Sequence, residues 1–239
     1  MIGLAEPSSP YGLLPLHERE ARGSALRLTH MTKLTAFVRR IRRDPTSGGN
    51  VPDFDPLDGG ERARVLVLLE APGRKAVATG FISRDNPDPT AANFFRVLKA
   101  SQLPRRDTVL WNIVPWYIGT PDRIRAAHSS DVEHGRMWLR RLLSYLPRLD
   151  FIVLVGAAAQ TVHPWLSTRT AVRILACHHP SPKVFNRWPD RRRENVEAFR
   201  YIRSQLTARS SGRPDSGQSR RRRPSARSWS PPAAADRGR

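Results

Sequence analysis

The sequence predicts an α/β fold, a three-layer sandwich in which a central, mainly parallel four-stranded sheet is flanked by helices. Short apolar runs that end at Gly, Pro or a polar residue alternate with stretches that repeat apolar residues at helical spacing. Helical connections between strands favour parallel pairing with right-handed crossovers. The first run, Val65–Leu69, is apolar throughout, which is typical of a strand buried on both faces.

The elements follow in order along the chain. Helices are expected at 29–43, at 90–100 with Thr90 as N-cap, at 130–146 with a capping box from Ser130 to Glu133, and at 190–206. A short helix limited by Pro164 should follow Gly156. Strands are expected at 65–69, 108–114, 151–155 and 172–176, and loops at 44–63 and 74–89.

The 239 residues are enough for one hydrophobic core with loose ends. Residues 1–28 are rich in Pro, Gly and Ser without a sustained period, and we expect a flexible N-terminal arm. Residues 29–207 should form the α/β domain. Residues 208–239 hold nine Arg and two Asp among Ser, Pro and Gly, which predicts a disordered basic tail.

Charge is the strongest signal in the composition. The chain has 41 Lys and Arg against 21 Asp and Glu, a net charge of +20, of which the tail supplies only 9 − 2 = +7. Such an excess favours nucleic acid as a partner, with an anionic membrane second, although a solvated surface would explain it too.

Other features narrow the class of protein. Cys177 is the only cysteine, so we expect a reducing, cytoplasmic setting without disulfides. The N-terminus lacks a secretory signal pattern, and the apolar stretch 151–159 is far shorter than the roughly 20 residues of a membrane helix. We expect a monomer that uses no metal and no cofactor.

Three polar clusters fall at carboxyl ends of predicted strands, where open α/β sheets bind ligands. They are Glu70 to Gly73, Asn112, and His179 to Pro182. A histidine in this place can polarise an oxygen, and a carboxylate can orient water. Asn112 is either a core amide with satisfied hydrogen bonds or a reader of a planar ligand edge.

The order and spacing of these clusters resemble the uracil-DNA glycosylase superfamily. Glu70-Ala71-Pro72-Gly73 is similar to the first motif of its bacterial and archaeal branches, and the segment from Gly80 to Arg84 resembles the one whose Phe stacks on the extruded base. Asn112 matches the Asn that reads the uracil edge. His179-Pro180-Ser181-Pro182 matches the second motif.

The resemblance implies a base-excision enzyme that extrudes a damaged nucleotide from single-stranded or duplex DNA and hydrolyses its N-glycosidic bond. It assigns His179 to the leaving base and a carboxylate, Glu70 or Asp85, to the sugar cation and water. Phe81 and Asn112 would bind the base together with the remaining first-motif residues. Ser181, Pro182, Lys183 and Arg187 would contact DNA.

Departures from the family pattern leave an alternative open. Ala71 stands where the most familiar branch has a water-activating Asp, and Lys183 stands where a Leu commonly enters the base stack. Val184 or Phe185 could take over that wedge. A single cysteine excludes the iron–sulfur cluster of another branch. The alternative function is a non-catalytic nucleic-acid-binding protein that retains the glycosylase fold.

Overall fold

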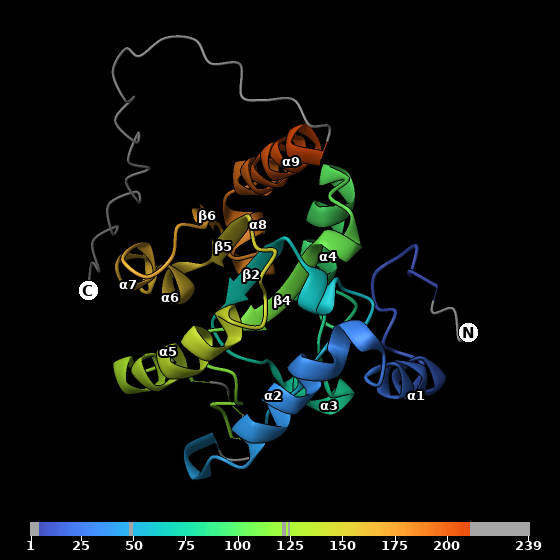
Figure 1. Ribbon diagram of the computed structural model, residues 1–239. Helices are drawn as coiled ribbons and strands as arrows, with labels where there is room; N and C mark the ends of the chain where they lie inside the picture. Colours follow the sequence, from blue (N-terminus) through green and yellow to red (C-terminus); the bar gives the residue numbers. More distant parts are fainter. Residues whose placement is uncertain (1–4, 48–49, 121–122, 124, 211–239) are drawn as a thin grey trace, which may run out of the picture.

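The central sheet has four strands, all parallel, in the order β4-β2-β5-β6 (Figure 1). In this computed structural model, residues 5–47, 50–120, 123 and 125–210 are described. The strands are β2 (Val65–Leu69), β4 (Thr108–Asn112), β5 (Phe151–Val155) and β6 (Arg173–Cys177). The parallel four-stranded sheet predicted from the apolar runs is therefore confirmed.

The two central strands explain why the apolar runs are unbroken. β2 pairs with β4 on one side and β5 on the other, and every residue from Val65 to Leu68 is fully buried. β5 is buried along its whole length. Strand β6 lies at the edge and begins with the exposed Arg173. A strand with helices on both faces has no solvated side, so it needs no polar alternation.

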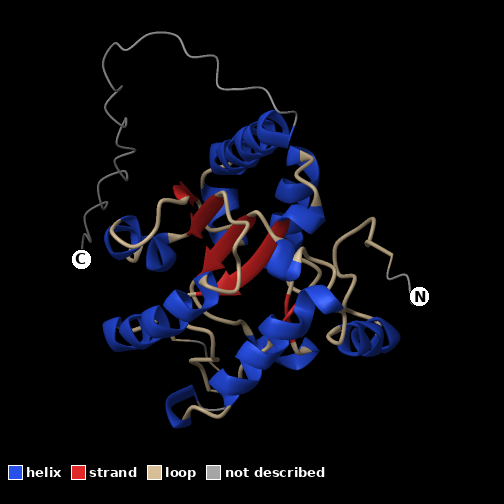
Figure 2. Cartoon of the chain, in the orientation of Figure 1, coloured by secondary structure: helices blue, strands red, loops and turns tan. Residues whose placement is uncertain are grey.

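Helices cover both faces of the sheet, which gives the predicted three layers (Figure 2). On one face, the ring of Phe37 lies 6.0 Å from Trp111 of β4 and 5.9 Å from Trp138. On the other face, Phe94 and Phe199 meet at 5.7 Å. These contacts pack α2 (Thr32–Arg42) with α5 (Ser129–Leu143) and α4 (Pro89–Ser101) with α9 (Asp190–Ser210).

Several short elements were missed because they are too short to show a period. The predicted loops 44–63 and 74–89 contain β1 (Asp53–Phe54), α3 (Arg74–Thr79) and β3 (Phe81–Ile82), and β1 pairs with β3 in parallel. The segment after Gly156 forms α6 (Ala157–Gln160) and α7 (His163–Ser167), so Pro164 opens a second helix instead of ending one. Helix α8 (Pro182–Arg187) follows the second motif.

Two predicted helix caps are wrong. Asp88, and not Thr90, caps α4: its Oδ1 accepts hydrogen bonds from the backbone N–H groups of Thr90 and Ala91, both at 2.9 Å. Helix α5 begins at Ser129, and the backbone N–H of His128 donates to Asp131 at 2.8 Å. In both cases an acidic residue near the start of the helix accepts the free amide hydrogens.

The prediction of a flexible arm at 1–28 is wrong for residues 16–25, which form α1 (Leu16–Ala25). The helix is held by a charge rather than by an apolar stripe. Arg22 is completely buried, pairs with Asp55 and reaches Asp85 at 2.7 Å. A helix anchored through one ionic residue has no hydrophobic period for the sequence to reveal.

Arg22 belongs to a buried group of three arginines and three aspartates, which we call the Arg–Asp cluster. Arg105 is its centre, with hydrogen bonds of 2.9 Å to Asp58 and 2.7 Å to Asp85 and Asp55. Buried charges are tolerated when opposite charges and hydrogen bonds compensate them. The cluster contains Arg22, Arg84, Arg105, Asp55, Asp58 and Asp85.

The C-terminal helix α9 runs to Ser210, three residues past the predicted end of the domain. The rest of the predicted basic tail, 211–239, lies outside the described residues. Within the described part of the chain, no helix is long and apolar enough to cross a lipid bilayer.

Candidate active site

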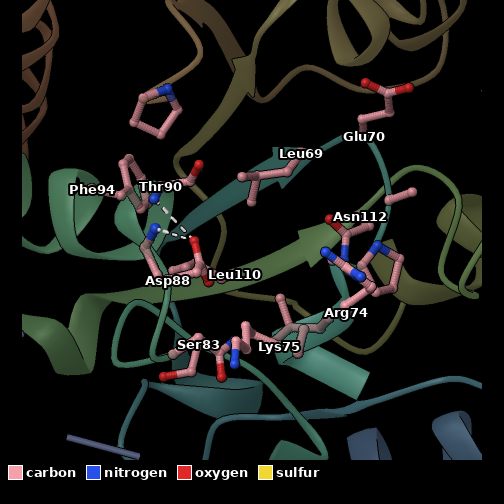
Figure 3. Close-up of a pocket in the computed structure, with 18 of the residues that line it drawn as sticks. Leu69, Glu70, Arg74, Lys75, Ser83, Asp88, Thr90, Phe94, Leu110 and Asn112 are labelled. Carbon is pink, nitrogen blue, oxygen red and sulfur yellow. Dashed lines mark hydrogen bonds between the residues drawn. The ribbon is translucent and has the colours of Figure 1, made fainter. Parts of the chain in front are cut away.

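A cavity of about 940 Å³ opens at the carboxyl edge of the sheet, where the sequence predicted a ligand site. Its walls come from the ends of β2 and β4, from α3, from the start of α4 and from the loop after β6 (Figure 3). Its polar and charged lining residues are Glu70, Arg74, Lys75, Ser83, Arg84, Asn86, Asp88, Thr90, Asn112, Arg125 and His179.

Glu70 and Asn112 reach this cavity from neighbouring strands. Leu69 pairs with Asn112 in the sheet, so Glu70 follows directly beside the end of β4 (Figure 3). The Oε1 of Glu70 accepts a hydrogen bond from the backbone N–H of Ala127 at 2.8 Å, which holds the carboxylate in place. Ala71, Pro72 and Gly73 continue the cavity wall.

Asn112 is 4% exposed and lines the cavity. Its side-chain amide makes no hydrogen bond with another residue that the structure describes, and it is not among the fully enclosed polar groups without a partner, which agrees with its place on the cavity wall. Of the two readings of Asn112, the structure therefore favours a group that a ligand edge would satisfy over a satisfied core amide.

His179 enters the cavity from the loop after β6. The backbone N–H of Ser181 donates to its Nδ1 at 3.3 Å. Because Nδ1 accepts this hydrogen bond, the proton of the neutral ring belongs on Nε2. Burial lowers the pKa of His179 below its usual 6.5, while the negative charges of Glu70 and Asp88 oppose this effect. The ring is therefore a neutral donor at pH 7.

The backbone that carries His179 is fixed from two sides. Asn195 of α9 is buried and accepts from the N–H of His178 at 2.9 Å, while its side-chain nitrogen donates to the carbonyl of His178 at 2.8 Å. Asn93 of α4 donates to the carbonyl of Pro180 at 2.9 Å. These two positioning residues escaped the sequence analysis, since single Asn residues inside helical stretches give no signal.

Asp88 is a lining residue that the sequence analysis also missed. One of its oxygens caps α4, and the carboxylate lies on the cavity wall (Figure 3). Its negative charge acts to raise the pKa of His179. The Pro-Asp-Pro pattern at 87–89 is the sequence signal that indicates a cap at this position.

The structure does not bring Asp85 or Phe81 to the cavity. Asp85 is completely buried in the Arg–Asp cluster, bound to Arg22 and Arg105, so it has no access to a substrate or to water. Phe81 is 5% exposed and is absent from the cavity lining, where Ile82 of the same strand stands instead. Successive strand residues point to opposite faces, which explains the exchange.

The predicted DNA-binding residues begin at the rim of the cavity. Ser181 precedes α8, Pro182 is its first residue, and Lys183 and Arg187 are exposed. Phe185 is buried in the core at 2% exposure, so the expectation that it could wedge into a base stack is wrong. Val184 is half-buried against the same core.

Taken together, the all-parallel α/β sheet brings a carboxylate, an amide and a histidine to one cavity at its edge. The chain belongs to the uracil DNA glycosylase superfamily, whose family model matches residues 56–203. That range includes every site residue described above. No functionally curated protein matches the chain.

Solved structures give a more distant comparison. A protein from Methanosarcina acetivorans, described as a candidate uracil DNA glycosylase and solved by NMR in solution, is similar with a TM-score of 0.42 and 18% sequence identity. The similarity covers 59% of this chain and 92% of that one.

Proposed function

We propose that this protein is a DNA glycosylase that hydrolyses the N-glycosidic bond of uracil, or of a related deaminated base, after the nucleotide has left the base stack. The observation that carries the proposal is that Glu70, Asn112 and His179 meet at one cavity in a chain of this superfamily. The target atom of a base inside a duplex is out of reach, so the enzyme extrudes the nucleotide.

Asn112 reads the extruded base. A uracil edge offers an adjacent N–H donor and carbonyl acceptors, and a side-chain amide can pair with both kinds of group. The amide has no other described partner, which supports this role. Phe94, a cavity residue that is 2% exposed, and Ile82 supply apolar walls for the ring.

His179 stabilises the leaving base. When the bond from C1′ to the ring nitrogen breaks, its electron pair departs with the base, and the negative charge spreads from that nitrogen onto a neighbouring carbonyl oxygen of the base. The neutral imidazole donates its Nε2–H to that oxygen. A positioned donor of this kind accounts for about 10²–10³ in rate when it acts on a developing oxyanion.

A carboxylate stabilises the cationic sugar and positions the water whose oxygen bonds to C1′. The water loses one proton, and the base finally takes one up. Glu70 is the first choice for this role because of its motif position. Asp88 is the other carboxylate on the cavity wall, and it replaces Asp85, which the Arg–Asp cluster occupies.

The test is single-turnover base release from oligonucleotides that carry uracil in single strands, opposite guanine or opposite adenine, with alkali cleavage at the abasic site. We expect release by the wild type and a loss of at least about tenfold in His179→Ala and in Asn112→Asp. His163→Ala is the matched control, because His163 stands in the chain's other His-Pro pair and is exposed in α7.

Ala71 supports a second candidate, a DNA-binding protein without chemistry, because its methyl group lines the cavity where the resemblance places a water-activating Asp. A protein with this second function would bind DNA but would not release uracil, hypoxanthine or xanthine. Release that survives in both His179→Ala and Asn112→Asp would overturn the first proposal.

A further inference from the structure

A solvent-exposed tryptophan stands between α8 and α9, close to the second motif. Trp188 is 41% exposed as a residue, whereas Trp111, Trp116 and Trp138 are buried. Phe185, one turn earlier, is part of the hydrophobic core, and Trp188 is not. A single exposed aromatic residue is common on protein surfaces, so the case for a binding contact at Trp188 rests on the groups that surround its ring.

Two arginines lie against this ring. The guanidinium carbon of Arg191 is 3.8 Å from the centre of the Trp188 ring, and that of Arg187 is 4.9 Å away. Such cation–π contacts hold otherwise mobile arginine side chains in place. With both arginines in place, 41% of the Trp188 residue is still open to solvent.

The backbone around Trp188 is fixed. Its N–H donates to the carbonyl of Val184 at 3.0 Å, and its own carbonyl accepts from the N–H of Arg191 at 3.1 Å. Pro189 follows directly and restricts Trp188 to an extended conformation, with φ −135° and ψ 83°. The ring is therefore presented from a rigid turn between two helices.

The surroundings of the ring are basic. Lys183 and Arg192 are exposed beside the two arginines, and Arg192 lies 5.3 Å from the ring of Phe185. The nearby carboxylates have partners of their own: Asp190 pairs with Arg193 at 3.2 Å, and Glu194 with His178 at 2.7 Å. We call Lys183, Arg187, Trp188, Arg191 and Arg192 the tryptophan platform.

The tryptophan platform is close to the cavity along the chain. Pro180 lines the cavity, Ser181 precedes α8, and Trp188 follows the last residue of that six-residue helix. Helix α8 packs against both α4 and α9. At 1.5 Å per residue, the helix spans about 9 Å, a length that two to three nucleotides of a DNA strand would follow at about 3.4 Å each.

We propose that the tryptophan platform binds the DNA strand next to the cavity, with an unpaired base stacked on Trp188 and neighbouring phosphates bound by Arg187 and Arg191. An aromatic ring among ordered cations fits single-stranded nucleic acid, because bases stack on aromatic faces and phosphates pair with arginine. The net charge of +20 favours this polyanion over a protein partner. The proposal rests on the proposed function only in taking DNA as the ligand, and it does not depend on whether the protein cleaves the N-glycosidic bond.

The test compares two strands that differ only in their bases. Fluorescence anisotropy measures the full chain with a labelled undamaged oligonucleotide, and with a strand of equal length whose nucleotides are abasic. We expect the wild type to prefer the strand with bases, and Trp188→Ala to lose about tenfold on that strand alone. Trp188→Phe should retain most of the preference. The charge contribution of the arginine-rich segment 211–239 is common to both strands and cancels.

Tyr201→Ala is the matched control, because Tyr201 is an aromatic residue of α9 that is 48% exposed. It should bind both strands as the wild type does. Equal binding by Trp188→Ala and the wild type, or an equal loss on both strands, would overturn the proposal. The proposal would also be overturned if Trp188→Ala changed the sedimentation coefficient of the protein without changing DNA binding, since this result would mean that Trp188 contacts a second copy of the protein. Undamaged DNA keeps this result separate from any failure of base release.

Discussion

Gly156 leaves room for His179. Strand β5 ends just before Gly156 and lies between β2, which leads to Glu70, and β6, which leads to His179. Both Glu70 and His179 line the cavity, so the His179 side chain lies beside the end of β5. A methyl group on Gly156 would lie 3.1 Å from Cβ and 3.2 Å from Cδ2 of His179. The residue also has φ 83° and ψ 165°, a conformation that is nearly exclusive to glycine.

We therefore expect Gly156→Ala to reduce single-turnover base release and to lower the free energy of unfolding by about 1–3 kcal/mol. Urea unfolding and alkali cleavage measure the two effects. Gly23→Ala serves as the control, because a methyl group there meets nothing within 4 Å and Gly23 lies in helix α1. Wild-type release by a folded Gly156→Ala would show that the ring position of His179 does not depend on this glycine.

The two cavity carboxylates should differ in their effects. Glu70→Gln keeps an oxygen that can accept the hydrogen bond from Ala127 but removes the charge, so we expect at least a tenfold loss of base release if Glu70 positions the water. Asp88→Asn also keeps an acceptor for the cap of α4. The variant with the larger loss of base release identifies the carboxylate that positions the water. If both variants released base at the wild-type rate, neither Glu70 nor Asp88 would have this role.

Asn195 should act on the reaction without touching the substrate. Asn195→Ala removes both hydrogen bonds to the half-buried backbone of His178, and we expect a loss of about 1–3 kcal/mol of stability. We expect slower base release with nearly unchanged DNA affinity at a temperature where the variant is folded. Circular dichroism verifies folding. A parallel loss of affinity and rate would indicate general unfolding of the site instead.

The depressed pKa of His179 predicts a pH dependence of stability. In the unfolded chain His179 binds a proton at the usual pKa of 6.5, whereas the half-buried ring of the folded protein binds it only at lower pH. Acidification from about 6.5 downward therefore favours the unfolded state, until the folded pKa is passed. We expect the wild type to lose more stability than His179→Gln between pH 7.5 and 5.5 in urea unfolding. A constant difference between the two proteins would contradict the neutral histidine.

Arg22 tests the Arg–Asp cluster. Arg22→Ala leaves Asp55 and Asp85 with less compensation inside the protein, and we expect a loss of about 3–5 kcal/mol in the free energy of unfolding. Arg27→Ala removes an exposed arginine two residues past α1 and should change stability by less than about 0.5 kcal/mol. If both variants lost a similar amount of free energy of unfolding, the buried ion pairs of Arg22 would contribute no more to stability than an exposed arginine does.

The sheet could be predicted because its evidence is local. Each central strand is an apolar run such as Val65–Leu69, and each run ends at a polar residue that the parallel topology carries to the same edge. For that reason Glu70, Asn112 and His179 could be assigned to one site before the structure was known.

The features that could not be predicted depend on contacts between residues that are distant in the sequence. Asp85 and Asp88 are three residues apart and equally acidic, yet the turn between them buries one with Arg105 and brings the other to the cavity. Nothing in the local pattern distinguishes them. Helix α1 likewise depends on partners of Arg22 that lie 33 and 63 residues further along the chain, and no local period records such pairs.

The Arg–Asp cluster has a consequence beyond stability. Its three arginines and three aspartates cancel, so the buried ionic group contributes nothing to the formal excess of +20. All of that formal excess belongs to the remaining residues of the sequence. A DNA strand then experiences a long-range attraction before any contact forms. The association rate should fall steeply as ionic strength rises, whatever reaction follows.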